Sequence, residues 1–397
     1  MRVAIVHDWL LGMRGGERIL NVFCKIFPQA ELFTLIHDKG SIDHILEDRP
    51  IHTSFLQNLP GSKTKYRNYL PLFPLAVESF DLEGFDLVIS SSHCVAKGAK
   101  KPKDAKHFCY CYTPMRYMWV FFDQYFGAYP PWKKSLVRLA GEYLKRWDIA
   151  TLPRVDEFIA ISRTIKDRIQ DIYKRDSTVI YPPVEIDKFK FNPSRKRGDY
   201  YVCVSALVPY KRIDIMVEAF NRMPDKKLVI VGDGNVRKEW EAKKTSPNIK
   251  FLGWVDHDEV INICDGAKAF LYAAFEDFGI APVEAQALGV PVIAYGKGGT
   301  AETVIPINTP REKMGQSPPA LSGVEGSGTV PIFSGAGKNP TGILFYKQEA
   351  ESLIDAINEF ERREAEFNPL DARRNAERFS EDKFVGNIKS FVNEKMR

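Results

Sequence analysis

The stretch from Phe275 to Ala285 has the clearest capacity for chemistry in this sequence, because it places two carboxylates, Glu276 and Glu284, eight positions apart. Pro282 between them predicts the first turn of a helix, where a missing N–H is harmless. This puts Glu284 in the first turn and Glu276 on the loop before it. Backbone N–H groups at that helix end would attract an anion. Together with carboxylates that accept hydrogen bonds from hydroxyls, they suit a nucleotide sugar. The alternative is helix capping beside a solvated acid.

The elements that must position these residues form an alternation of apolar strands and helical patterns, in two halves. The strands expected in the first half are residues 2–6, 85–90, 106–112 and 157–162. Those expected in the second half are residues 200–204, 227–234 (ending in a glycine turn), 249–253, 267–272 and 291–295. Such alternation predicts two α/β domains, each with a doubly wound parallel sheet. Ligands of these sheets lie at the carboxyl ends of the strands, so we expect a cleft between two facing domains.

Proline, glycine and serine mark the expected boundaries. Pro182 and Pro183 favour an extended linker, so the first domain is expected at residues 1–184 and the second at 185–378. A segment at about 306–340, rich in these three residue types, interrupts the second domain as a mobile insertion, or alternatively as an acceptor-side lid. The final helical pattern, at 379–397, is expected to pack back on the first domain.

Composition excludes several classes of protein. The chain has 397 residues, with 44% hydrophobic and 27% charged, as in ordinary globular proteins. A net charge of +5 is too small to indicate nucleic acid as a partner. The six cysteines are scattered and mostly lie in apolar runs, which favours buried thiols in a reducing cytosol. Neither a signal-peptide core nor a membrane-spanning apolar run is present, so we expect a cytoplasmic protein, peripheral at most.

Six short motifs together resemble the retaining glycosyltransferases of the GT-B type, in the large family numbered four. The motifs are Gly15–Arg18, Leu207–Arg212, Gly232–Gly234, Glu276–Glu284, Gly289–Ile293 and Gly298–Thr303. Two further segments, Ser90–His93 and Tyr112–Tyr117, look like the bacterial mannosyltransferase branch that builds O-antigen or exopolysaccharide. The resemblance implies a GT-B fold of two Rossmann-like domains facing a central cleft.

The resemblance assigns separate roles to the two carboxylates. In that family the first Glu contacts hydroxyls of the donor sugar, which implies Glu276, and the second holds the ribose, which implies Glu284. The amides around Phe278, Gly279 and Ile280 would reach the sugar or the diphosphate. These roles agree with the chemistry of the residues, because a vicinal diol is well held by one carboxylate.

Lys211 resembles the lysine of the family that binds the diphosphate. A fixed ammonium there would stabilise the negative charge of the leaving group. The alternative for Lys211 is an ordinary surface charge. Family members often carry an arginine five positions earlier, where this chain has Ala206, and Arg212 is a candidate to replace it. Gly232 and Gly234 complete the donor-side candidates.

The first half supplies the remaining candidates. Gly15 and Gly16 would let the backbone approach the diphosphate, although the pair is also compatible with a simple tight turn. His93 follows a strand and three serines, and would hydrogen-bond an acceptor or phosphate as a catalytic group; a satisfied structural histidine is the alternative. Relatives often carry a histidine where this chain has Tyr112. The acceptor-side candidates are Asp8, Tyr112 and Arg116.

The implied reaction retains the donor's anomeric configuration and uses neither metal nor cofactor. The chain has no Asp-x-Asp directly after a predicted strand. The leading hypothesis is a hexosyltransferase, an α-mannosyltransferase that moves mannose from GDP-mannose to a lipid-linked glycan. The alternatives are a same-fold transferase using a UDP- or dTDP-sugar, and a non-catalytic protein that binds sugar nucleotides. The anion site argues against an ordinary glycosidase pair.

Residues Trp132–Trp147 predict a basic amphipathic helix with tryptophans at its ends, which fits an anionic membrane surface at the inner face of the cell membrane. The loop Lys97–Lys106 adds five lysines, and Lys63, Lys65 and Arg67 add more positive charge. A lipid-linked acceptor would need such a surface. The alternative is that the apolar stripe belongs to the core and the lysines are merely solvated.

Overall fold

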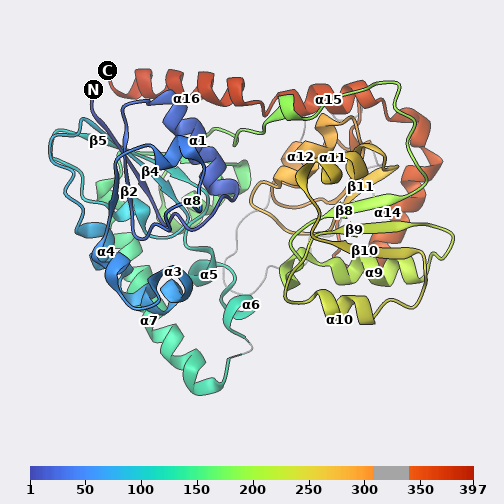
Figure 1. Ribbon diagram of the computed structural model, residues 1–397, viewed down its shortest axis with the longest axis horizontal. Coiled ribbons are helices and arrows are strands. Elements are labelled where there is room, and N and C mark those ends of the chain that lie inside the picture. The colour runs from blue at the N-terminus through green and yellow to red at the C-terminus, as the bar shows by residue number, and fades with distance from the viewer. Residues whose placement is uncertain (128, 308–338) are drawn as a thin grey trace. The chain divides into compact units, whose positions relative to one another are not determined.

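The computed structural model describes residues 1–127, 129–307 and 339–397 (Figure 1). These residues divide into two compact units: residues 1–182 with 384–397, and residues 183–383. The first division falls between Pro182 and Pro183. Almost all of the insertion expected at about 306–340 lies outside the described residues.

Unit 1 is built on a parallel sheet of seven described strands, in the order β3-β2-β1-β4-β5-β6-β7. The strands are β1 (Val3–His7), β2 (Glu31–Thr34), β3 (Ile51–Thr53), β4 (Leu87–Ser92), β5 (Lys106–Cys111), β6 (Glu157–Ala160) and β7 (Thr178–Val179). All five residues of β1 and all six of β4 are buried, as expected for strands covered on both faces. Continuous apolar sequence therefore predicted these central strands.

The short edge strands were not predicted from the sequence. β3 has one half-buried residue followed by two exposed ones, and β7 contains only two residues beside the proline pair. Strands this short and exposed carry too few apolar residues to show a period. They join the sheet because neighbouring strands offer them hydrogen-bond partners, as β2 does for β3.

Helices separate the strands of unit 1 along the chain. They are α1 (Gly15–Ile26), α2 (His44–Glu47), α3 (Ser62–Lys65), α4 (Phe73–Glu78), α5 (Arg116–Trp119), α6 (Phe122–Phe126), α7 (Pro131–Ala150) and α8 (Arg163–Tyr173). The core of this unit combines apolar side chains from β1, β4, α4 and α5 with those of the connecting loops, such as Cys94, Val95 and Ala99 after β4. In Figure 1, α7 extends beyond the other helices of its unit and away from the sheet.

The last helix, α16 (Glu381–Lys395), supplies a buried face to unit 1. The Phe384 ring lies 5.4 Å from that of Phe23 and 5.6 Å from that of Tyr110, measured between ring centroids. Further along the helix, Phe391 lies 5.5 Å from Phe108. Unit 1 therefore needs a segment that is separated from its other parts by the whole of unit 2, residues 183–383.

Unit 2 repeats the architecture with a parallel sheet of six described strands, in the order β10-β9-β8-β11-β12-β13. The strands are β8 (Tyr201–Val204), β9 (Leu228–Val231), β10 (Ile249–Gly253), β11 (Ala269–Tyr272), β12 (Val292–Tyr295) and β13 (Gly342–Phe345). The helices are α9 (Ile213–Asn221), α10 (Arg237–Ala242), α11 (His257–Asp265), α12 (Ile280–Ala287), α13 (Thr300–Thr303), α14 (Ala350–Arg362) and α15 (Pro369–Glu377). Only β13, which follows the insertion, was missed.

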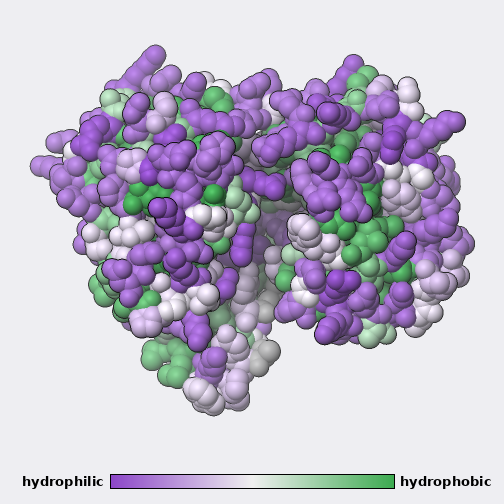
Figure 2. Space-filling model, in the orientation of Figure 1, coloured by the Kyte–Doolittle hydropathy of each residue, from purple (hydrophilic) through white to green (hydrophobic). Residues whose placement is uncertain are grey.

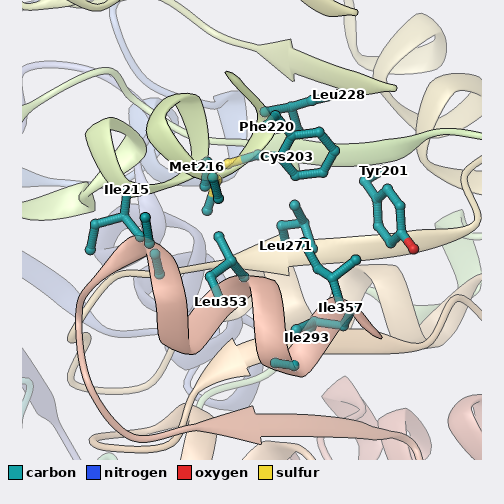
Figure 3. Packing of buried hydrophobic residues seen from close by; sticks show 14 of the residues in the cluster. Tyr201, Cys203, Ile215, Met216, Phe220, Leu228, Leu271, Ile293, Leu353 and Ile357 are labelled. Atoms are coloured by element: carbon teal, nitrogen blue, oxygen red, sulfur yellow. The ribbon is translucent and has the colours of Figure 1, made fainter. Parts of the chain in front are cut away.

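The core of unit 2 lies between its sheet and the helices α9 and α14, which pack against each other. Figure 3 shows Leu353 and Ile357 of α14 facing Leu271 of β11, with Met216 of α9 beside them. All four side chains are at most 2% exposed. This packing holds the strand ends that carry the candidate residues.

Both sheets reverse their strand order at one point. In unit 1 the reversal lies between β1 and β4, and in unit 2 between β8 and β11. Loops leave such adjacent strands toward opposite sides, so the carboxyl ends of the two strands frame a crevice where doubly wound proteins bind ligands. The predicted fold class, two doubly wound parallel sheets, is confirmed.

Candidate functional site

Lys211 and Glu276 meet at the reversal point of unit 2. Lys211 ends a short 3-10 turn (Pro209–Lys211) after β8, and Glu276 follows β11. The Lys211 Nζ lies 2.7 Å from Glu276 Oε1 and donates a hydrogen bond of 3.2 Å to the Tyr272 hydroxyl. The two charged side chains are 15% and 17% exposed. The structure therefore joins two sequence-predicted residues and adds a third, Tyr272.

The surroundings of Lys211 favour its ammonium form. Burial alone would lower the pKa of Lys211, but the Tyr272 oxygen and the Glu276 carboxylate outweigh it and raise the pKa above its ordinary value. Lys211 is therefore a fixed positive charge at neutral pH. This excludes the surface-charge alternative, because a solvated lysine would not be enclosed in this way.

The loop that carries Glu276 is held by a second loop of unit 2. Glu276 forms an isolated parallel bridge with Gly298, and the Gly299 N–H donates to the Glu276 carbonyl oxygen at 2.8 Å. A Cβ on Gly298 would overlap that oxygen, and one on Gly299 would overlap the backbone of Phe278. The glycine pair therefore allows the two loops to approach closely enough to fix Glu276.

The helix after Glu276 begins earlier than the sequence predicted. α12 starts at Ile280 with Gly279 as its N-cap, so Pro282 is its third residue. Glu284 is then the fifth residue and lies in the second turn, which corrects the predicted first-turn position. Proline is tolerated throughout the first turn, so it marks the start of a helix only to within two residues. Phe278, just before the helix, is buried with its ring 5.5 Å from that of Phe379.

Gly232 and Gly234 place the loop after β9 against the loop after β8. A Cβ on Gly232 would overlap the Ser205 carbonyl oxygen, and one on Gly234 would overlap that of Leu207. The packing of these two loops therefore leaves no room for a side chain at Gly232 or Gly234. Contact with a donor stays a prediction for both.

Arg212 does not share the partners of Lys211. Its Nε donates to Asp214 at 3.2 Å, and its Nη2 donates to the Gln348 carbonyl oxygen at 3.3 Å. Arg212 has a left-handed backbone conformation, with φ of 54°, as it caps α9. Ala206, at the position of the missing arginine, is exposed. The Arg212 guanidinium is therefore directed to Asp214 and Gln348 and does not contact the Lys211–Glu276 pair.

Asp8 and His93 form a closed arrangement at the reversal point of unit 1. Asp8 follows β1, is fully buried and accepts the backbone N–H groups of residues 93–96 at 2.7–3.0 Å. The His93 Nδ1 lies 2.9 Å from Asp8 Oδ2, and its side chain is 33% exposed. The carboxylate thus orients both the loop after β4 and the imidazole that this loop presents.

Charge and burial oppose each other in this pair. Burial raises the pKa of Asp8, but the charge of His93 and the hydrogen bonds outweigh it, and the pKa falls to about 2. Burial likewise lowers the pKa of His93, and the Asp8 carboxylate overcomes this and raises it above its ordinary value. Asp8 is therefore ionised at neutral pH, and the cationic form of His93 is favoured.

A hydrogen-bonded chain connects β1, β4, β5 and the start of α1 beside this pair. The His7 Nδ1 lies 3.0 Å from Ser91 Oγ, which lies 2.8 Å from the Tyr112 hydroxyl. Tyr112 also donates to the carbonyl oxygen of Gly16 at 3.2 Å. Glu17, next to Gly16, faces His7 with 3.8 Å between Oε1 and Nε2. The structure thus brings Gly16, Tyr112 and His93 to one edge of the sheet.

Arg116 and Gly15 occupy the ends of nearby helices. Arg116 opens α5, with its guanidinium carbon 4.6 Å above the centre of the Phe121 ring. Gly15 is the first residue of α1. His7, Ser91 and Tyr272 were not predicted as site residues from the sequence. Each lies at or next to the carboxyl end of its strand, and this position is the only sequence signal that could have indicated them.

The described residues contain no cluster of three or more His, Cys, Asp or Glu side chains suited to hold a metal. Asp256 and Asp258 do have Asp-x-Asp spacing, but Asp256 is the N-cap of α11 and accepts the Glu259 N–H at 2.9 Å. All six cysteines are buried free thiols. Among the described helices, none has the length and apolar character needed to cross a bilayer.

Two residues expected at a membrane surface are enclosed in unit 1. Lys97 is 2% exposed and its Nζ lies 2.9 Å from Asp148 Oδ1, so the prediction that Lys97 belongs to a basic surface loop is wrong. Trp147 is half-buried and its Nε1 donates to Glu78 at 2.7 Å. The spacing of lysines in the sequence did not reveal that one of them, Lys97, pairs with the buried carboxylate of Asp148.

Two family models match this chain. Residues 184–309 match the family described as glycosyl transferases group 1, and residues 32–188 match glycosyltransferase family 4. Together the matches run from residue 32 to residue 309, which is most of the chain. The chain belongs to glycosyltransferase family 4.

Among curated proteins, this family 4 chain is similar to bacterial mannosyltransferases. It is 32% identical over 180 residues to the GDP-mannose-dependent monoacylated α-(1-6)-phosphatidylinositol monomannoside mannosyltransferase of Corynebacterium glutamicum, covering 38% of this chain and 47% of that protein. It is 27% identical over 153 residues to the O-antigen chain mannosyltransferase RfbU of Salmonella typhimurium, covering 36% and 43%. The chain thus spans less than half the length of these relatives.

Two solved structures share the fold of this family 4 chain. Anabaena HepE in complex with UDP has a TM-score of 0.67 at 16% identity, covering 99% of this chain and 100% of that one. Sucrose-phosphate synthase from Thermosynechococcus elongatus has a TM-score of 0.69 at 16% identity, covering 99% and 98%. The predicted GT-B class is confirmed by this agreement in fold.

Proposed function

We propose that this chain is a retaining hexosyltransferase, an α-mannosyltransferase that transfers mannose from GDP-mannose to a glycan. The observation that carries the proposal is the Lys211–Glu276 pair at the reversal point of unit 2. It sets a fixed cation beside a carboxylate, where a nucleoside diphosphate sugar needs both. The curated relatives, whose names specify GDP-mannose or an O-antigen chain, support mannose as the sugar.

The sugar, the ribose and the phosphates of the donor each have a chemically suitable partner in unit 2. Glu276 accepts hydrogen bonds from the sugar hydroxyls, and Glu284 holds the two ribose hydroxyls. The N-terminus of α12, with the amides of Phe278, Gly279 and Ile280, attracts the phosphates through the partial positive charge of the helix. These assignments follow the family resemblance.

Lys211 stabilises the leaving nucleoside diphosphate. An ammonium has three N–H donors, and the Tyr272 and Glu276 contacts use two, which leaves a third for a phosphate oxygen. Because this charge is already in place before the reaction, it costs no reorganisation when the anion develops. We therefore propose a reaction that needs no metal, and turnover that is unchanged by a chelator.

His93 acts on the acceptor side of the reaction in unit 1. Its Nδ1 is held by Asp8 and its side chain is 33% exposed, so Nε2 is the ring nitrogen that meets a hydroxyl or phosphate of the acceptor. Asp8 itself is fully buried, so it serves as a positioning residue rather than touching the acceptor. Gly15 and Gly16 open α1 beside this edge and supply backbone donors.

The test of this proposal compares site variants with matched surface variants in unit 2. Glu276→Gln and Lys211→Ala should each lower kcat/KM for donor hydrolysis and transfer about 100-fold or more. Glu351→Gln and Lys243→Ala change exposed residues of the same types and should leave both rates unchanged. Full turnover in both site variants, with intact circular dichroism, would rule out the assigned roles.

A panel of donors separates the proposal from its alternatives. Incubation with GDP-mannose, UDP-glucose and a dTDP-sugar should give hydrolysis or transfer with GDP-mannose alone. A preference for a UDP- or dTDP-sugar would leave the family assignment unchanged and would show that GDP-mannose is not the donor. Binding of a sugar nucleotide without release of sugar from any donor would instead indicate a non-catalytic binding protein.

We further propose that the acceptor glycan is linked to a lipid and is reached at the inner face of the cell membrane. The C. glutamicum relative is named for a phosphatidylinositol mannoside, which is a glycolipid. Transfer to acceptors that differ only in their lipid tail tests this point. Equal kcat/KM with and without the lipid would show that the lipid is not recognised.

A further inference from the structure

The apolar stripe of α7 faces away from the core of unit 1. Trp132, Leu136, Leu139 and Tyr143 recur at spacings of four, three and four residues, which places them on one helix face. Their side chains are 67%, 60%, 72% and 45% exposed, respectively. The alternative that the stripe belongs to the core is therefore excluded for these four residues, whereas Trp147 at the end of the helix does pack against the core. Leaving four large apolar groups in water is costly enough to indicate a partner.

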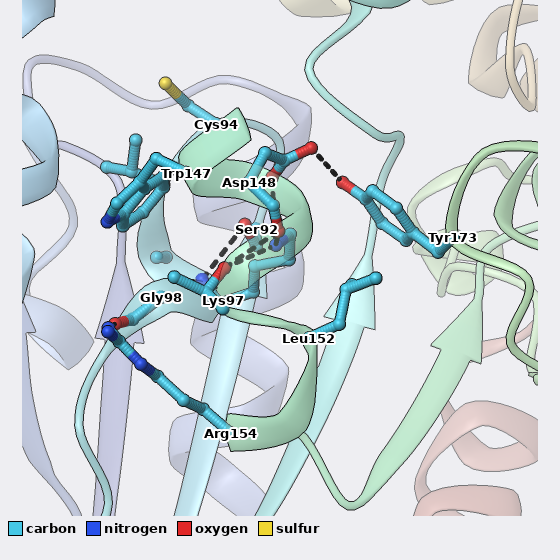
Figure 4. A network of polar contacts seen from close by, with 12 residues as sticks. Ser92, Cys94, Lys97, Gly98, Trp147, Asp148, Leu152, Arg154 and Tyr173 are labelled. Atoms are coloured by element: carbon cyan, nitrogen blue, oxygen red, sulfur yellow. Dashed lines mark hydrogen bonds and ion pairs between the residues drawn. The ribbon is translucent and has the colours of Figure 1, made fainter. Parts of the chain in front are cut away.

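The opposite end of α7 is fixed by a buried polar network (Figure 4). The Lys97 Nζ lies 2.9 Å from Asp148 Oδ1 and donates to the Asp148 carbonyl oxygen at 2.7 Å. The other carboxylate oxygen of Asp148 accepts from Tyr173 and from Trp119, both at 2.8 Å. The helix is therefore held firmly at its C-terminal end while its N-terminal half presents the stripe.

Positive charge lies beside the stripe. Within α7 there are five basic residues and two acidic ones, and one of the acidic residues is the buried Asp148. Lys133, Arg138 and Arg146 are exposed. Cationic side chains beside large apolar ones at an exposed surface are typical of helices that lie at an anionic lipid surface.

Neighbouring segments extend the same surface. Tyr125 in α6 and Tyr129 after it are 46% and 37% exposed, and the Lys133 Nζ lies 4.2 Å from the centre of the Tyr129 ring. Figure 2 shows apolar side chains at the surface where α7 extends beyond its unit. Aromatic residues of this kind favour the boundary between headgroups and acyl chains.

We propose that the α7 surface, formed by Trp132, Leu136, Leu139, Tyr143 and the cations beside them, inserts shallowly into a membrane that contains anionic lipids. A bilayer suits these features better than a protein partner, because the surface is a narrow, projecting ridge with exposed lysine and arginine side chains, not a broad complementary face. This inference deepens the proposed lipid-linked acceptor and rests on that part of the proposed function.

Flotation of the full chain with lipid vesicles tests the surface without any measurement of turnover. Wild-type protein should bind phosphatidylcholine vesicles that contain phosphatidylglycerol, and should bind less to phosphatidylcholine alone or at high salt. Leu136→Gln with Leu139→Gln should weaken binding about tenfold or more, since two exposed leucines leave the acyl region. Lys133→Gln with Arg138→Gln should weaken binding only to the anionic vesicles.

The chain offers a matched control. Trp254 is 79% exposed in unit 2, so Trp254→Gln removes an exposed tryptophan outside the α7 surface and should leave vesicle binding unchanged, whereas Trp132→Gln should weaken it. Absence of vesicle binding by the wild type, or equal binding by the leucine variant, would overturn the proposal. So would a wild-type dimer in sedimentation that the leucine variant converts to monomer, because a second copy would then cover the surface. Loss of vesicle binding with intact donor turnover would count against the membrane surface alone. Loss of donor turnover with intact vesicle binding would count against the proposed transferase alone.

Discussion

Lys211 and Glu276 are 65 positions apart in the sequence, and their chemistry depends on the 2.7 Å contact between them. Tyr272, the last residue of β11, accepts a further hydrogen bond from the Lys211 ammonium. The same principle holds in unit 1, where Asp8 and His93 come from β1 and from the loop after β4. Individual residues therefore acquire their charge states from partners that are distant in sequence.

Tyr272 should act as a positioning residue for Lys211. Tyr272→Phe removes one hydrogen bond to an ammonium, worth about 1.5 kcal/mol, so kcat should fall about tenfold. KM for the donor should change less, because Glu276 and Glu284 remain. The control is Tyr346→Phe, at a half-buried tyrosine of unit 2, which should keep wild-type kinetics. Equal kcat in Tyr272→Phe and wild type would contradict this role.

His93 should titrate above its ordinary pKa of 6.5, because Asp8 favours the imidazolium. NMR titration of histidine-labelled protein, with His93→Gln to assign the resonance, measures this pKa. Since the folded pKa is raised, its contribution to stability is complete below about pH 6.5 and is lost as the pH rises through the folded value. Asp8→Asn should lower the pKa of His93. A value unchanged by Asp8→Asn would show that Asp8 does not determine the charge of the imidazole.

Helix α7 shows that one element can serve two environments. Its C-terminal end carries the buried Asp148, and its N-terminal half carries four exposed apolar residues. Twenty residues span about 30 Å, enough to separate these two environments. Amphipathic pattern alone could not tell which face is buried, since the stripe resembles that of any core-packing helix.

Lys97 should be a major stabilising residue of this element, in contrast to its neighbour Lys100. Lys97→Met leaves Asp148 as a buried carboxylate without its cation, which should lower the free energy of unfolding by about 3–5 kcal/mol. Lys100→Met removes an exposed cation from Glu78, which keeps Arg154 and Trp147 as partners, and should cost less than about 1 kcal/mol. Denaturant unfolding of both variants measures the difference. Equal stability of the two would contradict the buried network.

At the scale of the whole molecule, each unit has its own sheet and its own core. The chain returns to unit 1 at its end, where α16 adds Phe384, Ile388 and Phe391. Local stability should therefore follow the units rather than the order of the sequence.

Two buried phenylalanines test this division. Phe384→Ala should destabilise unit 1 and Phe360→Ala unit 2, each by about 3–5 kcal/mol, because both rings are at most 1% exposed. Hydrogen exchange followed by mass spectrometry should show faster exchange in β5 and α1 for the first variant, and in β8 and α14 for the second. Uniformly faster exchange in both units for either variant would show a single cooperative unit.

Much of the fold followed from sequence because central parallel strands are buried on both faces and appear as continuous apolar runs. β1, β4, β8 and β11 were all expected within two residues of their observed ends. The strands β2, β3, β7 and β13 and the start of α12 were not, because short strands and a proline within the first turn carry weak signals. The assigned roles of Glu276, Lys211 and His93 stay predictions, although their positions are now known.

The sequence by itself determined which residue types stand at the strand ends, since motifs such as Glu276–Glu284 and Gly298–Thr303 are local and depend on turns and helix starts. Only the tertiary structure decided what each side chain contacts. It buried Lys97 against Asp148, enclosed Asp8 beneath His93, turned Arg212 toward Asp214 and left the α7 stripe exposed. The physical reason is that burial and ion pairing depend on contacts between distant segments, which no local pattern specifies.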